Sequence, residues 1–130
     1  MKRMLCKAIP TAIALAALIV GTTFAASTNT VTLAARSGQE VFTNYTPGAT
    51  SAYGRGTCYG GGSAMNLRLW RTDMKPERYI YSITVSSGST NVETPSDRAP
   101  SEKPNYRVSI RANAPSTFAG GHGYCNYTTY

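Results

Sequence analysis

The sequence contains few of the residues that build metal and catalytic sites, with one His, one Trp and three Cys in 130 residues. Zinc sites need clusters of His and Cys, and calcium sites need closely spaced acidic side chains, so neither is expected here. The six Asp and Glu are scattered, and no Gly-x-Ser-x-Gly motif marks a serine nucleophile. We therefore expect no metal, no cofactor and no enzymatic activity.

Long hydrophobic runs are also missing, except for one at the N-terminus. Three basic side chains in the first seven residues precede an apolar stretch over 8–21. Small residues at Thr23 and Ala25 match a signal-peptidase site, and the apolar stretch is shorter than the ~20 residues of a spanning helix. We expect a bacterial-style signal peptide over 1–25, cleaved near Ala25, and one secreted domain over 26–130, extracellular or periplasmic. An uncleaved anchor is the alternative.

The positive charge of the chain is smaller than it first looks. Three basic residues leave with the N-terminal segment, so the formal charge falls from +7 to +4. No run of five Lys or Arg occurs, and a charge of this size does not by itself indicate a nucleic-acid partner. We expect no nucleic-acid partner and no stable membrane insertion, and the sequence leaves the oligomeric state open.

Cleavage would also remove Cys6 and leave an even pair, Cys58 and Cys125. Secreted proteins fold in an oxidising environment, where such a pair usually forms a disulfide. In the chain-entropy model, a bridge closing this loop of 67 residues contributes ~4 kcal/mol. We therefore predict a Cys58–Cys125 disulfide, which would leave no thiol for cysteine catalysis.

Strict alternation of apolar and polar residues predicts β-strands. The clearest runs are 106–112, 79–85 and 65–70, with weaker candidates at 30–35, 39–45 and 123–129. In 79–85 the alternation places Tyr79 on the same apolar face as Tyr81. No run has apolar residues at helical spacing over two turns. We expect a small antiparallel β-sandwich of about six to eight strands, with a small β-barrel as the alternative.

Residues 86–105 interrupt this pattern as a long polar connection with three prolines. A connection of that length is a functional loop, a short edge hairpin or a mobile segment. Its acidic and basic residues are mixed, which argues against a dedicated surface for a polyanion or a metal ion.

Two glycine-rich segments, 52–58 and 119–125, share the form Ala-x-Gly-basic-Gly-x-Cys. The structural interpretation is two glycine-containing loops that lead into strands joined by the disulfide. The functional interpretation is an anion-binding nest, in which backbone N–H groups lie beside Arg55 and His122.

Tyrosine is the abundant aromatic residue, with nine copies, as in many recognition surfaces. Alternation places Trp70 opposite Leu67 and Leu69 and beside Arg68. A ring there could stack on a sugar or anchor a protein partner. The candidate binding residues are Trp70, Arg68, Arg55, His122, Tyr127 and Tyr130.

These features predict a secreted, non-catalytic binding protein whose partner is a glycan or a protein at a cell surface. A small basic bacteriocin-like toxin is one alternative. A protease or hydrolase inhibitor that presents the 86–105 segment is another. A metal-free nuclease using Glu40, His122 and Arg55 is the one enzymatic alternative that the composition permits.

Overall fold

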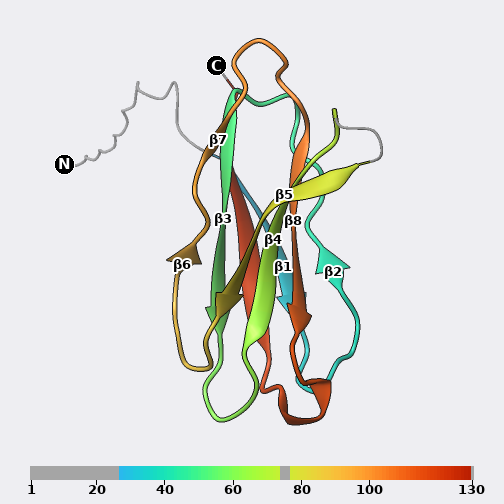
Figure 1. The fold of residues 1–130 in the computed structure, drawn as a ribbon, viewed down its shortest axis with the longest axis vertical. Coiled ribbons are helices and arrows are strands. Elements are labelled where there is room, and N and C mark those ends of the chain that lie inside the picture. Colours follow the sequence, from blue (N-terminus) through green and yellow to red (C-terminus); the bar gives the residue numbers. More distant parts are fainter. Residues whose placement is uncertain (1–26, 74–76, 130) are drawn as a thin grey trace, which may run out of the picture.

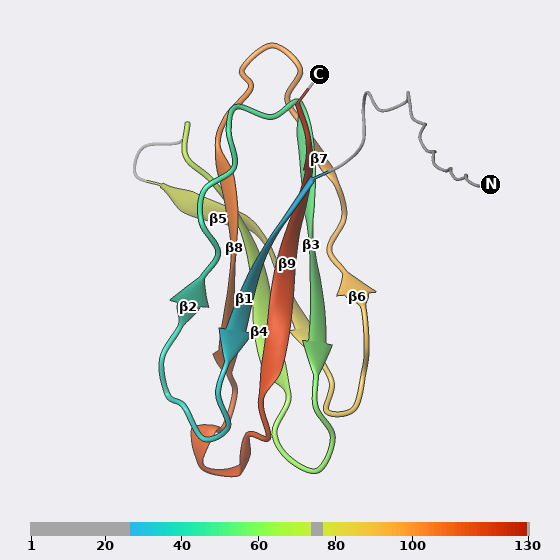
Figure 2. The same ribbon diagram turned by 180° about the vertical axis from the view of Figure 1, so that it is seen from behind.

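The protein folds into two antiparallel β-sheets packed face to face, as the computed structural model of residues 27–73 and 77–129 shows (Figures 1 and 2). Sheet A has the order β1-β9-β3-β6, with β7 also pairing with β3, and sheet B has the order β2-β8-β4-β5. The two sheets share no strand and do not close, so the expected β-sandwich is confirmed and the small β-barrel alternative is wrong. The proposed signal peptide, 1–25, lies outside the described residues.

Six of the strands in the described part are long and three have two residues. Sheet A contains β1 (Ser27–Leu33), β3 (Ser51–Cys58), β6 (Val92–Glu93), β7 (Asp97–Arg98) and β9 (Gly121–Thr128). Sheet B contains β2 (Val41–Phe42), β4 (Met65–Arg71), β5 (Arg78–Val85) and β8 (Tyr106–Ala112). One 3₁₀ helix, η2 (Pro115–Thr117), precedes β9. No helix within the described residues has the length and hydrophobicity to cross a membrane.

The core forms between the inner faces of the two sheets, where alternation had placed apolar residues. Met65, Leu67 and Leu69 of β4 are fully buried, as are Val108 and Ile110 of β8. The strands β4 and β8 pair with Leu67 opposite Ile110 and Leu69 opposite Val108. The predicted faces of these two strands are therefore confirmed.

Tyr79 departs from the predicted alternation. The register between β4 and β5 shifts between Leu69 and Trp70, so Leu69 lies opposite Tyr81 and Trp70 lies opposite Tyr79. A β-bulge adds one residue on a strand and so changes which face the following side chains occupy. Tyr79 consequently lies on the outer face beside Trp70, and the prediction that it shares a face with Tyr81 is wrong.

The first repeated glycine segment lies within β3, and most of the second lies within β9. Gly54 and Gly56 belong to β3, and Gly121 and Gly123 belong to β9. A Cβ atom at Gly56 would lie 3.0 Å from Met65 Cε of the opposite sheet, so the missing side chain lets the sheets approach closely. Extended backbone does not form a nest of N–H groups, so the anion-nest interpretation is wrong. The loop interpretation is wrong for 52–58 but describes Ala119 and Gly120, which precede β9, with Gly120 at a φ of +107°.

Within the described residues, Cys58 and Cys125 are free and buried. In the β3–β9 register, Cys58 lies opposite Gly121 and Cys125 lies opposite Gly54, so the cysteines are four residues apart along the ladder. That separation is about 13 Å at ~3.3 Å per residue, whereas disulfides join Cα atoms less than ~7 Å apart. The structure contradicts the predicted Cys58–Cys125 disulfide.

The 86–105 segment runs along the free edge of β3. Its two short strands pair there, with Val92 opposite Gly56 and Asp97 opposite Ala52. The Asp97 carboxylate accepts hydrogen bonds from Tyr106 Oη at 2.6 Å and from Arg71 Nη1 at 3.0 Å. Of the three interpretations of this segment, edge pairing describes the structure best.

Candidate binding surface on sheet B

The outer face of sheet B presents the side chains that alternate with the core residues of β4 and β8. Arg68 and Trp70 lie outward on β4, and Arg107 and Ser109 lie outward on β8. The register places Trp70 opposite Arg107 and Arg68 opposite Ser109. Two sequence-predicted binding residues, Arg68 and Trp70, therefore lie on one face with further polar side chains.

Aromatic side chains from three strands meet on this face. The Trp70 ring lies 5.3 Å from the Tyr79 ring and 5.7 Å from the Phe42 ring, between centroids. The Trp70 indole Nε1 donates a hydrogen bond to Ser109 Oγ at 2.8 Å, and Ser109 itself is fully buried. Trp70 is half-buried at the centre of the cluster, while Phe42 and Tyr79 are 37% and 43% exposed.

Two arginines lie against these rings. The Arg68 guanidinium lies 4.6 Å from the Tyr79 ring centroid. The Arg107 guanidinium lies 4.1 Å from the Phe42 ring centroid and 4.6 Å from that of Tyr45. Such cation–π contacts contribute about 0.5–1 kcal/mol each at exposed sites. We call this set the aromatic–arginine surface: Phe42, Tyr45, Arg68, Trp70, Tyr79 and Arg107.

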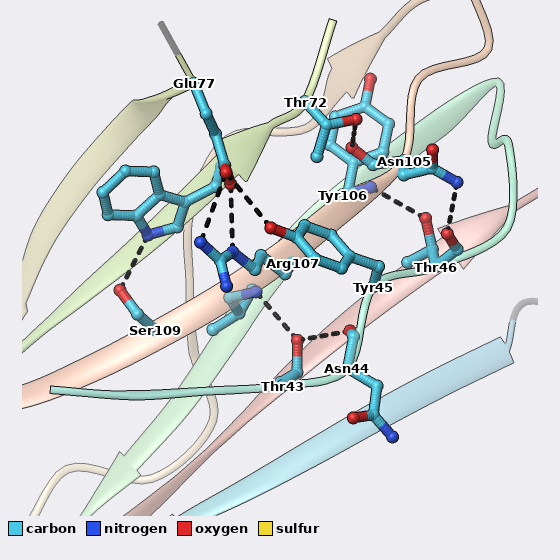
Figure 3. Close-up of polar contacts among 12 residues, drawn as sticks. Thr43, Asn44, Tyr45, Thr46, Thr72, Glu77, Asn105, Tyr106, Arg107 and Ser109 are labelled. Atoms are coloured by element: carbon cyan, nitrogen blue, oxygen red, sulfur yellow. Dashed lines mark hydrogen bonds and ion pairs between the residues drawn. The ribbon is translucent and has the colours of Figure 1, made fainter.

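Each arginine of the aromatic–arginine surface is paired with a glutamate. Arg68 Nη1 lies 3.4 Å from Glu40 Oε2, which also accepts a hydrogen bond from Ser109 Oγ at 2.6 Å. Arg107 donates from Nε and Nη2 to the two Glu77 oxygens at 3.0 and 3.3 Å (Figure 3). The charge of each arginine on this surface is therefore paired with a carboxylate.

A pocket of about 410 Å³ adjoins this surface. We call it the side pocket; its lining residues are Tyr45, Thr72, Glu77 and Asn105. They come from the same end of sheet B, because Thr72 follows β4, Tyr45 follows β2, and Glu77 and Asn105 precede β5 and β8. Tyr45 Oη donates to Glu77 Oε1 at 3.2 Å (Figure 3).

The arrangement offers exposed ring surface beside hydrogen-bonded polar groups. Glu40 and Glu77 are both held in ion pairs with arginines. Across the described residues, no group of three or more His, Cys, Asp or Glu side chains is placed to hold a metal ion.

Arg55 and His122 lie together on the outer face of sheet A. The Arg55 guanidinium lies 5.3 Å from the Tyr124 ring centroid, and the His122 ring lies 5.2 Å from it. His122 Nδ1 shares a hydrogen bond with Tyr59 Oη at 3.0 Å. These predicted residues therefore do not join Trp70 and Arg68, which lie on the other sheet.

The other predicted site residues are Tyr127, Tyr130 and the nuclease set of Glu40, His122 and Arg55. Tyr127 is partly buried and packs against the core, so it is not presented as a free binding ring. Tyr130 lies outside the described residues. The proposed nuclease set is not assembled, because Glu40 contacts Ser109 and Arg68 of sheet B, while His122 and Arg55 lie on the outer face of sheet A.

Of the residues in the aromatic–arginine surface, only Arg68 and Trp70 were predicted as binding residues from the sequence. Arg107 was on the polar face of its predicted strand, and that alternation was the available signal for it. Tyr79 was placed on the apolar face with Tyr81, because the bulge leaves no mark in the sequence. The chain around Phe42, Tyr45 and Glu77 forms only short or irregular segments. Periodicity there does not show which face of a sheet a side chain occupies.

Comparison with known proteins adds little to this picture. Neither the family models nor the curated proteins that were compared give a match to this chain. Among solved structures, the chain is similar to one described as "Bacillus endospore appendages form a novel family of disulfide-linked pili". The TM-score is 0.46 and the sequence identity 13%, over 90% of this chain and 100% of that one. A similarity at this level assigns neither family nor function.

Proposed function

We propose that this protein is a secreted, non-catalytic binding protein that recognises carbohydrate of a cell envelope through the aromatic–arginine surface. One observation carries the proposal. Four large hydrophobic side chains are exposed within the described residues, and three of them, Phe42, Tyr45 and Tyr79, belong to this surface. Exposed aromatic side chains gathered in one place mark a binding site, because scattered ones need no explanation.

Carbohydrate suits the surface because a sugar ring combines an apolar C–H face with polar hydroxyl groups. Its C–H bonds form an apolar face that gains from contact with an aromatic ring, and its hydroxyl groups need hydrogen-bond partners when they leave water. The surface supplies both within a few ångströms, since Tyr45 and Phe42 lie against Arg107, which is hydrogen-bonded to Glu77.

The pairing of the arginines also bears on specificity. Arg68 and Arg107 are each engaged by a glutamate, so the surface is not a cationic patch for polyanions. Weak salt dependence of binding follows, because few counterions are released when the ligand binds. The toxin-like and inhibitor alternatives remain predictions that nothing in the structure tests.

The test is a pull-down of the protein with insoluble polysaccharides and purified cell-wall material. We compare the wild type with Tyr79→Ala and Phe42→Ala, and Tyr53→Ala on the outer face of sheet A serves as the matched control. We expect the first two variants to bind at least tenfold more weakly and the control to bind like the wild type. Equal binding by all four proteins, or binding by none of them, would contradict the proposal.

A further inference from the structure

The side pocket lies beside the exposed ring of Tyr45 and has the size of a small-ligand site. Its volume is about 410 Å³, within the ~300–1,000 Å³ range typical of such sites. The Tyr45 ring, 47% exposed, belongs to both the pocket and the aromatic–arginine surface. One carbohydrate chain bound on that surface would therefore extend into the pocket with its next sugar ring.

The hydrogen-bond donors on the pocket walls are largely used by the protein itself. Tyr45 Oη donates to Glu77, and Thr72 Oγ1 donates to the Asn105 carbonyl at 3.1 Å. Asn105 Nδ2 donates to the Thr46 carbonyl at 2.6 Å (Figure 3). What the walls offer a ligand is mainly lone pairs, on Glu77, Thr72 and the Asn105 side-chain oxygen. The pocket therefore favours ligands that bring donors.

The charges around the pocket disfavour an anion. The Glu77 carboxylate is the charged group among the lining residues, and Arg107 balances it. The Arg107 guanidinium is in turn occupied by Glu77 and by the Phe42 and Tyr45 rings. The nearby Arg71 is held by Asp73 and Asp97. A carboxylate or sulfate in the pocket would thus meet Glu77 with no free cation on the described walls.

We propose that the side pocket is a subsite for one neutral, hydroxyl-rich sugar ring and that Glu77 excludes acidic sugars from it. This inference rests on the proposed function. The hydroxyl groups donate to Glu77, Thr72 and Asn105, while the C–H face of the ring lies on Tyr45. A carboxylate on the ligand would bring no donor to Glu77, and it would find the nearest guanidinium, that of Arg107, already paired with Glu77.

The experiment measures binding to matched neutral and acidic ligands. The probes are a soluble β-glucan, a mannan and a galactan, each used unmodified and after oxidation of C6 to the carboxylate. The proteins are the wild type, Glu77→Gln, Tyr45→Phe and the control Glu93→Gln, an exposed glutamate on β6. Thermal melting of each variant checks that it is folded.

We expect the wild type to bind at least one neutral polymer at least tenfold more tightly than its oxidised form. Glu77→Gln replaces one acceptor oxygen by a donor and leaves Arg107 unbalanced, so it should reduce that preference to less than threefold. Tyr45→Phe keeps the ring and should retain the preference with weaker binding. Glu93→Gln should behave like the wild type.

Two different failures are distinguishable. If the wild type binds, but binds neutral and oxidised polymers alike or keeps its preference in Glu77→Gln, the subsite proposal is wrong and the binding surface stands. If no polymer binds, or if binding is unaffected by Tyr79→Ala and Phe42→Ala, the proposed function is wrong and the subsite is wrong with it.

Discussion

Trp70 donates its indole N–H to the hydroxyl of Ser109, 2.8 Å away on the neighbouring strand. Ser109 is fully buried, so this bond ties the centre of the aromatic–arginine surface to a group that water does not reach. The same hydroxyl donates to Glu40 at 2.6 Å. One small side chain therefore positions both an aromatic ring and the carboxylate that pairs with Arg68.

Replacing Ser109 by Ala should destabilise the protein by about 1–3 kcal/mol, because the partly buried indole N–H loses its acceptor. Denaturant unfolding measures the change. Ser82→Ala, at an exposed position of β5, is the matched control and should be within about 0.5 kcal/mol of the wild type. Equal stability of the two variants would show that the Trp70–Ser109 bond does not fix the surface.

The free cysteines make the protein insensitive to reductant. Because Cys58 and Cys125 are four residues apart in the β3–β9 register, adding dithiothreitol should leave the unfolding midpoint unchanged. Alkylation of the denatured, unreduced protein should label both positions, as peptide mapping by mass spectrometry would show. A fall in the midpoint with reductant, or a peptide linking the two cysteines, would contradict the observed register.

Burial raises the pKa of Cys125 from 9.0 to about 12. The neutral thiol is favoured in the folded state, so its contribution to stability is complete below about pH 9 and is lost as the pH rises toward 12. By pH 10 the loss is about 1 kcal/mol. The destabilisation caused by Cys125→Ala, measured against the wild type by urea unfolding, should therefore shrink between pH 8 and pH 10. A constant difference would argue that the thiol is exposed in the folded state.

The glycines of β9 should not tolerate a side chain. A Cβ atom at Gly121 would lie 2.6 Å from the Thr57 carbonyl oxygen and 3.0 Å from Met65 Sδ. Gly121→Ala should cost about 1–3 kcal/mol or prevent folding, because the obstructing atom is backbone. At Gly38 the nearest atom would be 3.8 Å away, so Gly38→Ala should melt near the wild type. A tolerated Gly121→Ala would mean that β9 does not lie this close to Thr57 of β3 and Met65 of sheet B.

The sequence predicted the strands whose inner faces alternate without interruption, and the reason is physical. In Tyr106–Ala112 each apolar residue faces the core, so a period of two survives in the sequence. In Ser51–Cys58 the inner positions are Ala52, Gly54 and Gly56, which are small because sheet B lies close to them. A strand whose inner face is glycine has no hydrophobic period, so it resembled a loop.

The binding surface was predictable only in part for a related reason. Trp70 and Arg68 lie in a regular strand, and their facing follows from alternation. Tyr79 joins them because of a register shift that depends on the packing of β5 against β4. The disulfide prediction failed because composition and compartment do not reveal register, which decides whether two cysteines can meet.

Trp70 is the one tryptophan of the chain and lies at the centre of the aromatic–arginine surface, so it reports directly on the central claim. The measurement is a titration of ¹⁵N-labelled protein with a neutral oligosaccharide from the polymer that binds best, followed by the indole N–H resonance. We predict a saturable shift of this resonance, together with shifts in β4, β5 and β8, and unchanged resonances around His122 and Tyr124. Binding that shifts the residues around His122 and leaves the Trp70 indole unmoved would place the site on sheet A and contradict the account.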